Sequence, residues 1–243
     1  KEIQNKNFQS KEKGLKNIVI TGVTGFIGKN LVENLMSHEN YHLIVISRSI
    51  EKIKNNNISI FYSELSELKE SSIIFDNVDF VIHLASEVKY NDGDNIYENN
   101  INGTKYLLRS IGKRNKENVK IIFSSSIGAI DRNKKDQCDK PLNILSKPYP
   151  SSYYGYSKLV GEKLIKKFTD KNIILRICWC YGKYMTPDTH MKFLFNATKK
   201  NKFYSYFNFP SKISLIHVDD LLGIIKYFLK NEKINKTYYV HNG

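Results

Sequence analysis

The sequence is poor in cysteine and has no long apolar run, and both absences narrow the class of protein. Three cysteines in 243 residues argue against a disulfide framework and favour a reducing compartment. No apolar run approaches the roughly 18 residues of a membrane span. Residues 1–16 are polar and basic, without the apolar stretch of a signal peptide. We therefore expect a cytoplasmic protein with no membrane partner.

Arginine is also scarce, although the chain is strongly basic. The formal net charge is +14, yet only five residues are arginine, and lysines are scattered along the chain among many asparagines. This distribution favours solvated surface lysine and a genome-level compositional bias over a nucleic-acid surface, so no nucleic-acid partner is predicted. The general positive field would still attract phosphorylated or nucleotide-bearing small molecules.

Short apolar runs alternate with helical patterns over most of the chain. Helical patterns fit residues 26–36, 96–113 and 153–169. Continuous apolar strands separated by helices predict a parallel sheet covered on both faces, which is a doubly wound α/β fold of the Rossmann type. The expected strands are residues 17–21, 42–46, 58–62, 80–84, 120–123 and 173–177.

The pattern changes near residue 181, where loop-like segments begin. The elements expected there are helices at 191–200 and 218–230 and strands at 213–217 and 237–240. We expect a basic extension over residues 1–16, a dinucleotide-binding domain over 17–180, and a small C-terminal substrate lobe over 181–243 that is interleaved with it. The chain starts without methionine and stops just after a strand, so a trimmed end is also expected.

A glycine-rich turn follows the first expected strand directly. Thr21-Gly22-Val23-Thr24-Gly25-Phe26-Ile27-Gly28 joins that strand to the first helix. In a dinucleotide-binding turn, Gly22 makes the tight turn, Gly25 lets the backbone approach a pyrophosphate, and Gly28 lets the helix pack on the strand. Phe26 and Ile27 would place the helix N-terminus against the phosphate charge. A purely structural turn is the alternative.

The end of the second expected strand carries no carboxylate. An acidic residue there would bind the ribose 2′-hydroxyl of NAD, whereas an arginine accommodates the 2′-phosphate of NADP. Counting about 20 residues from the glycines reaches Ile46-Ser47-Arg48-Ser49. NADP is therefore favoured over NAD, with Arg48 as its phosphate partner. An exposed loop position for Arg48 is the alternative.

Tyr154 and Lys158 lie four residues apart on the expected helix at 153–169, and therefore on one face. With 16 tyrosines and many lysines in the chain, this spacing also arises by chance. Its position after the fifth strand of a dinucleotide-binding pattern favours a catalytic interpretation of the pair over a chance occurrence. An exposed pair on a solvated helix is the alternative.

From residue 17 to about residue 243, these motifs resemble the extended short-chain dehydrogenase/reductase family, in its NAD-dependent epimerase/dehydratase group. Six motifs occur in the family's order: Thr21 to Gly28, His83 to Ser86, Asn100 to Thr104, Phe123 to Ser126, Tyr154 to Lys158, and Ile216 to Asp220. Dimers formed through a helix pair are common in this family, which allows a homodimer here.

The resemblance implies roles for individual residues. Tyr154 is expected as the catalytic general acid/base, Lys158 and Ser126 as its supporting catalytic residues, and Asn100 as the asparagine that supports the active site. Lys158 and the oxidised nicotinamide would both favour the phenolate of Tyr154, while the cofactor carries the hydride. Further cofactor contacts are expected from Leu84, Ala85, Ser86, Ser124, Tyr154 and Lys158.

Departures from the family bear on the substrate. Sugar-nucleotide 4,6-dehydratases carry an acidic pair just after the catalytic serine or threonine, whereas this chain has Ile127-Gly128, which disfavours dehydration. Many sugar-nucleotide epimerases carry an asparagine where this chain has Trp179. They also carry an arginine where it has Ile213, with Lys212 adjacent. These changes weaken a nucleotide-sugar substrate without excluding it.

The leading hypothesis is an NADP-dependent reductase or dehydrogenase for a carbonyl or alcohol of a small molecule, with nucleotide sugars among the candidates. The alternative is a nucleotide-sugar epimerase with a retained NAD or NADP, and a non-catalytic dinucleotide sensor is a third. No metal site is expected, because Cys178 and Cys180 lack two further ligands. His83 and His217 are expected to be satisfied by hydrogen bonds. The aromatic residues of 203–209 favour a lobe core over a substrate wall.

Overall fold

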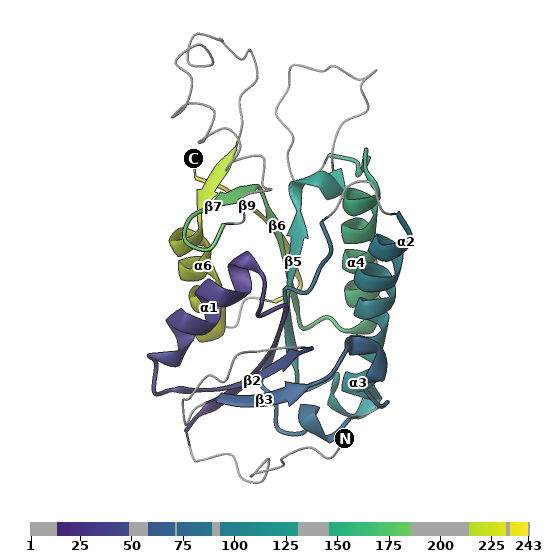
Figure 1. Ribbon diagram of the computed structural model, residues 1–243. Helices are drawn as coiled ribbons and strands as arrows, with labels where there is room; N and C mark the ends of the chain where they lie inside the picture. Colours follow the sequence, from purple (N-terminus) through teal and green to yellow (C-terminus); the bar gives the residue numbers. More distant parts are fainter. Residues whose placement is uncertain are drawn as a thin grey trace.

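A seven-stranded parallel sheet with helices on both faces forms the centre of the protein (Figure 1). The computed structural model describes residues 14–48, 58–70, 72–88, 93–130, 146–185, 214–231 and 234–242. The strands are β1 Lys16–Thr21, β2 Tyr41–Ser47, β3 Ile58–Tyr62, β4 Phe80–His83, β5 Lys120–Ser126, β6 Asn172–Ile177, β7 Trp179–Tyr181, β8 Leu215–His217 and β9 Lys236–Val240. The α-helices are α1 Phe26–Met36, α2 Gly93–Ile96, α3 Gly103–Asn115, α4 Tyr153–Phe168 and α6 Val218–Lys230.

The strand order confirms the doubly wound fold. The order across the main sheet is β3-β2-β1-β4-β5-β6-β9, and all neighbouring strands are parallel. The chain therefore proceeds outward from β1 in one direction and then resumes on its other side with β4. This topological switch point opens a crevice at the carboxyl ends of β1 and β4, where doubly wound sheets bind ligands.

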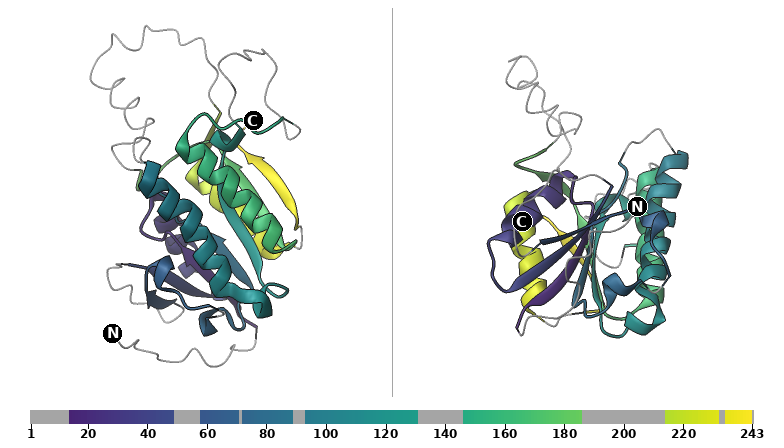
Figure 2. Two further views of the ribbon diagram at one scale, coloured as in Figure 1. Left: turned by 90° about the vertical axis from the view of Figure 1, so that its right-hand side faces the viewer. Right: turned by 60° about the horizontal axis from the view of Figure 1, so that its bottom comes forward.

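The alternation of side chains along each strand builds two cores. Ile18 and Ile20 of β1 point to the face covered by α1 and α6, whereas Val19 points to the face covered by α3 and α4. Figure 2 shows these two helical layers on either side of the sheet. Because both faces are covered, the central strands carry continuous apolar runs, such as residues 18–20 of β1 and 80–82 of β4, rather than alternating apolar and polar residues.

Several element bounds agree with the sequence pattern, while β5 is longer than expected. Helices at residues 26–36 and 218–230 and the strand at 58–62 are observed with the predicted limits. The fifth strand continues three residues beyond the expected 120–123 to Ser126, so the serine-rich segment is its carboxyl end. No helix in the described parts of the chain has both the length and the apolar character of a membrane span.

Two elements expected in a C-terminal lobe belong to the main sheet and its cover. Strand β9 pairs in register with β6 as the seventh strand, and α6 packs against α1. Beside them, β7 and β8 form a two-stranded parallel sheet. The expected helix at 191–200, the aromatic segment 203–209, Lys212 and Ile213 lie outside the described residues.

The helix expected over residues 96–113 is not a continuous α-helix. Residues Tyr97–Asn102 form a π-helix, η3, between α2 and α3. The Thr104 hydroxyl donates to the carbonyl oxygen of Asn100 at 2.7 Å, and the amide of Gly103 donates to the carbonyls of Asn100 and Glu98. Wider turns of this kind are frequent at functional sites, since they redirect side chains that a regular helix would place elsewhere.

We expect two helical glycines to respond in opposite ways to replacement by alanine. A Cβ at Gly155 in α4 would lie 2.2 Å from the carbonyl oxygen of Gly128, whereas a Cβ at Gly223 in α6 meets nothing within 4 Å. Gly155→Ala should lower the free energy of unfolding by about 1–3 kcal/mol through overpacking. Gly223→Ala should raise it by about 0.5–1 kcal/mol. Denaturant unfolding of both variants measures this, and equal effects would contradict the close approach of α4.

Candidate active site

The glycine turn leaves an open space at the start of α1. Gly22 has φ +75°, and a Cβ there would lie 2.5 Å from the backbone nitrogen of Ala85; a Cβ at Gly28 would lie 2.2 Å from the Gly22 carbonyl oxygen. Packing therefore requires both of these glycines. A Cβ at Gly25 meets only the Gly22 carbonyl, at 3.3 Å. The space in front of Gly25 is thus left for a ligand that comes close to the backbone.

The N-terminus of α1 has no side-chain cap among the described residues. Gly25, its N-cap residue, has no side chain that could accept its first amides, and its first turn has no acidic residue. The first backbone N–H groups of a helix, here at Phe26 and Ile27, have no acceptor within it. The side chain of Ile27 packs against the core, so this residue can offer a ligand only its backbone. These features fit the pyrophosphate of a dinucleotide.

A cavity of about 260 Å³ lies at the carboxyl ends of β1 to β4. It collects the predicted cofactor residues Gly22, Gly25, Arg48, Leu84, Ala85 and Ser86. It is not lined by Phe26, Ile27, Gly28, Asn100, Ser124, Ser126, Tyr154 or Lys158. The cavity lies where doubly wound sheets bind ligands, and the predicted catalytic residues lie outside it.

A buried histidine joins the glycine turn to the π-helix. The Thr104 hydroxyl donates to Asn100, so it accepts from Nε2 of His83 at 3.0 Å. Nδ1 of His83 then accepts from the Thr21 hydroxyl at 2.7 Å, and Thr21 Oγ1 accepts from the amide of Ala85 at 3.3 Å. Both ring nitrogens are satisfied in one neutral tautomer. As the sequence predicted, His83 is satisfied by hydrogen bonds.

Asn100 connects the segment after β4 to helix α4. Its Oδ1 accepts from the amide of Glu87 at 2.6 Å, and its Nδ2 donates to the Glu87 carbonyl and to Oγ of Ser157, both at 2.9 Å. Ser157 in turn donates to the carbonyl of Tyr154 at 2.8 Å. The side chain is buried. It holds the segment after β4 against helix α4, and its role in supporting an active site stays a prediction.

Lys158 is buried beside the Tyr154 ring. Its Nζ donates to the carbonyl oxygen of Ser124 at 2.8 Å, lies 5.6 Å from the centroid of the Tyr154 ring and 5.1 Å from that of Phe123. Burial lowers the pKa of Lys158 to about 7. The Ser124 hydroxyl is buried and donates to the carbonyl of His83 at 3.1 Å, so it joins β5 to β4 and does not line the cavity.

Ser126 ends β5 with its hydroxyl oriented by the following turn. Its Oγ accepts from the amide of Gly128 at 3.2 Å. An oxygen that accepts this bond keeps its own proton for a further acceptor. Ser126 can therefore donate a hydrogen bond to a substrate oxygen.

A buried ion pair secures the far side of α4. Nε and Nη2 of Arg176 each donate to Glu162 at 2.8 Å, and the hydroxyl of Ser125 donates to Glu162 at 2.5 Å. Burial lowers the pKa of Arg176, but the hydrogen bonds and charge of Glu162 outweigh it, so the net shift is upward. With Ser125, the pair connects α4, β5 and β6, and the two charges neutralise each other.

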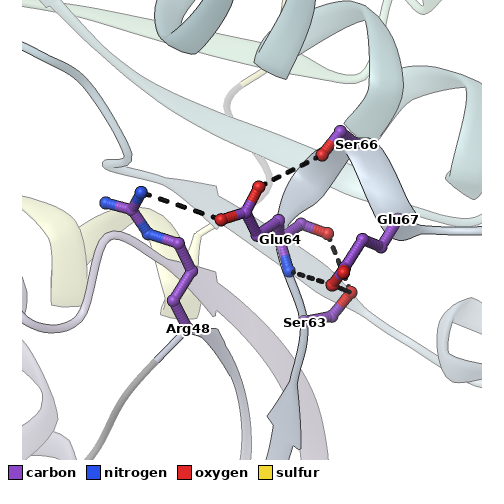
Figure 3. Close-up of polar contacts among 5 residues, drawn as sticks. All are labelled: Arg48, Ser63, Glu64, Ser66 and Glu67. Carbon is purple, nitrogen blue, oxygen red and sulfur yellow. Dashed lines mark hydrogen bonds and ion pairs between the residues drawn. The ribbon is translucent and has the colours of Figure 1, made fainter.

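Arg48 lines the cavity at the end of β2, beside a partner that sequence reasoning missed. Its Nη1 is 3.9 Å from Oε1 of Glu64, and its side chain is 74% exposed (Figure 3). Glu64 follows β3, which pairs with β2, so both residues reach the carboxyl edge of the sheet side by side. The position of Glu64 just after the expected strand at 58–62 was the signal that could have identified it.

The two cysteines after β6, Cys178 and Cys180, contribute to packing, and neither has the features of a reactive thiol. Cys178 belongs to the core and Cys180 packs against it. Burial raises the pKa of Cys178 to about 11 and that of Cys180 to about 12, so both thiols stay protonated at neutral pH. Within the described ranges, no three His, Cys, Asp or Glu residues gather as a metal site.

Comparison with known proteins places this site in a family. Residues 18–240 match the NAD dependent epimerase/dehydratase family. A protein of Methanocaldococcus jannaschii, provisionally assigned as a UDP-glucose 4-epimerase, is 33% identical over 195 residues, which cover 70% of this chain and 58% of that protein. The dTDP-4-dehydrorhamnose reductase of Aggregatibacter actinomycetemcomitans is 26% identical over 69% of this chain and 52% of its own length. The chain thus spans little more than half of these curated relatives.

Solved structures agree on the fold. The UDP-glucuronic acid 4-epimerase of Bacillus cereus, in complex with UDP-glucuronic acid and NAD, superposes with a TM-score of 0.76. The match covers 93% of this chain and 78% of that one, at 21% identity. This likeness establishes the Rossmann-type architecture.

We expect His83 to make the protein sensitive to acid. Burial, aided by the charge of Lys158, lowers the pKa of His83 to about 3. Below about pH 6.5 the unfolded state takes up a proton that the folded state does not, so stability falls as the pH drops toward 3. His83→Gln should make this fall shallower than in the wild type, whereas His38→Gln should not. Urea unfolding across pH 4 to 8 measures both, and parallel pH profiles for wild type and His83→Gln would contradict the assignment.

We expect Lys158 to lower stability in the ligand-free protein. Its folded pKa of about 7 lies below the ordinary value of 10.5, so wild-type stability rises as the pH increases between these values. Lys158→Met removes the buried amine and should raise the melting temperature by a few degrees at pH 7, with a gain that shrinks toward pH 10. Lys163→Met, at an exposed position of the same helix, is the control. A destabilised Lys158→Met at pH 7 would contradict the prediction.

Proposed function

We propose that this chain, which belongs to the NAD dependent epimerase/dehydratase family, is an oxidoreductase dependent on NAD or NADP that interconverts a carbonyl and an alcohol. The observation that carries the proposal is the buried Lys158 amino group beside the Tyr154 ring, on the helix that packs next to Ser126. A cation is costly to bury unless it serves a nearby group that develops negative charge. A non-catalytic sensor would have no need of it.

The chain's own residues supply proton transfer and orientation. Tyr154 gives a proton to the oxygen of a carbonyl substrate, or takes one from an alcohol, and Lys158 stabilises the phenolate that results. Ser126 donates a hydrogen bond to the same oxygen, because its Oγ is held by the Gly128 amide. Gly25 and the N-terminus of α1 hold the phosphates of the dinucleotide. The nicotinamide supplies or accepts the hydride when it is bound.

A nucleotide sugar is the proposed substrate class, with net oxidoreduction ahead of epimerisation. The UDP-sugar and dTDP-sugar names of the relatives support the class. Ile127 and Gly128 follow Ser126 in a short turn and carry no acid or base, so dehydration is disfavoured. Trp179, in place of the asparagine of many epimerases, is partly exposed on β7 and favours the reductase. The epimerase named among the relatives keeps epimerisation as the second candidate.

NADP is the proposed cofactor, with Arg48 as the partner of its 2′-phosphate. Arg48 lines the cavity at the end of β2, where no carboxylate precedes it. A cytoplasmic location and a homodimer formed through a helix pair are also proposed, on the cysteine content and on the resemblance to the family.

Replacement of Tyr154 tests the proposed chemistry. Tyr154→Phe should lower kcat by about 10²-fold or more, because the general acid/base is lost, while binding of NADPH and NADH stays intact. Tyr153→Phe, at an exposed neighbouring position, is the matched control and should retain activity. Assays would use UDP-glucose, UDP-glucuronic acid and dTDP-4-dehydrorhamnose.

The readout separates the two candidate reactions. A reductase changes the absorbance of the reduced nicotinamide in proportion to product, whereas an epimerase interconverts sugars with no net change in the cofactor. Full activity of Tyr154→Phe, or a wild type that binds neither NADPH nor NADH, would overturn the proposed function.

A further inference from the structure

The end of β3 places a carboxylate beside the only arginine that lines the described cavity. Tyr62 of β3 pairs with Ser47 of β2, so the residues that follow both strands meet at the same edge of the sheet. Arg48 and Glu64 both line the cavity, and Figure 3 shows the guanidinium directed toward the Glu64 carboxylate. Any group bound at Arg48 must therefore also meet Glu64.

Glu64 is held in this position by the short turn η1, Leu65–Glu67. Its amide donates to Oε2 of Glu67 at 2.9 Å, and its carbonyl accepts from the amide of Glu67 at 3.2 Å and the hydroxyl of Ser63 at 2.8 Å. The hydroxyl of Ser66 donates to Glu64 Oε2 at 3.4 Å. The backbone is thus fixed at both ends of the turn, and the carboxylate stays at the rim of the cavity.

The contact between the two charges is weak enough to be exchanged. The separation of 3.9 Å exceeds hydrogen-bond length, and the side chains are 74% and 54% exposed. Exposed ion pairs of this kind contribute little to stability. A phosphate with two negative charges is a stronger partner for a guanidinium than a single carboxylate is. Arg48 can therefore leave Glu64 for a phosphate, but the carboxylate remains nearby.

The described side chains that line the cavity carry a net negative charge despite the basic character of the chain. Among the described residues that line it, three are carboxylates, Glu64, Glu87 and Glu98, and Arg48 is the only Lys or Arg. Glu64 is the one that contacts Arg48. The 2′-phosphate of NADP would gain the attraction of Arg48 and at the same time meet the repulsion of Glu64, whereas the uncharged 2′-hydroxyl of NAD would meet no such repulsion.

We propose that Glu64 is a specificity-determining residue that limits selection of NADP over NAD by competing with the 2′-phosphate for Arg48. This inference rests on the proposed function, because it assumes that the cavity holds the adenosine half of the cofactor. The preference for NADP is set by the pair of residues rather than by Arg48 alone.

The test compares ligands that differ only in the 2′-phosphate. Adenosine 2′,5′-bisphosphate and ADP probe the adenosine half, and NADPH and NADH probe the whole cofactor, all by titration of the full chain. Glu64→Gln should tighten binding of the two 2′-phosphorylated ligands about fivefold, as expected for removal of one nearby like charge. It should change the affinity for ADP and NADH less than about twofold. Arg48→Gln should weaken the phosphorylated ligands about tenfold or more.

Glu67→Gln is the matched control, since it removes one charge from the same turn and the amide can still accept the hydrogen bond of the Glu64 backbone. It should shift the ratio of NADPH to NADH affinity less than about twofold. In an Arg48→Gln background, Glu64→Gln should have a smaller effect than in the wild type, because the competition is gone. The inference is overturned if Glu64→Gln leaves the ratio of NADPH to NADH affinity unchanged, or if Glu67→Gln changes it by the same amount. In either case, binding of the ligands by the wild type still supports the proposed function. A wild type that binds none of the four ligands overturns the proposed function itself.

Discussion

The position of the reacting groups depends on how closely helix α4 approaches the carboxyl end of strand β5. Gly155 lies against the backbone of Gly128, and Gly161 lies against a buried aromatic ring of β5. Lys158 falls between these two contacts and reaches a main-chain carbonyl of the strand. A side chain at either glycine would push the helix outward and withdraw Lys158 and Tyr154 together. The proposed proton transfer therefore requires glycine at positions 155 and 161 as well as the side chains of Lys158 and Tyr154.

The same helix also explains why the charge of Lys158 stays available. Glu162 lies one turn further along α4, at the spacing where opposite charges normally pair. Here both of its oxygens accept from Arg176, and Ser125 donates to it as well, so no ion pair joins Glu162 to Lys158 in the described part of the chain. Glu162 and Lys158 are therefore buried on one helix but contact different groups: Glu162 pairs with Arg176, whereas Lys158 lies beside the Tyr154 ring. Arg176 stabilises the packing by pairing with Glu162, and Lys158 remains beside the Tyr154 ring, as its proposed role requires.

Local patterns were sufficient to predict the Rossmann sheet, most element bounds and the residues around the glycine turn, because these depend on spacing along the chain. They did not predict what depends on pairing between distant segments. Strand β9 reads like any short strand, and only its register with β6 places it in the main sheet. The π-helix around Asn100 arises from hydrogen bonds that a regular helical pattern does not encode. Glu64 was missed for the same reason, since its partner Arg48 follows a neighbouring strand and does not lie at a motif spacing from it.

The two halves of the site are built under different constraints. The reacting half is set by buried groups such as Lys158, which is 3% exposed and enclosed by α4 and β5, so few substitutions there leave the packing intact. The adenosine half is set by the ends of β2 and β3, where Arg48 and Glu64 are largely exposed and contact each other only weakly. Replacing either residue costs little stability, because surface positions tolerate substitution. If the proposed function holds, cofactor preference can therefore change at this edge of the sheet while the proposed proton-transfer residues stay the same.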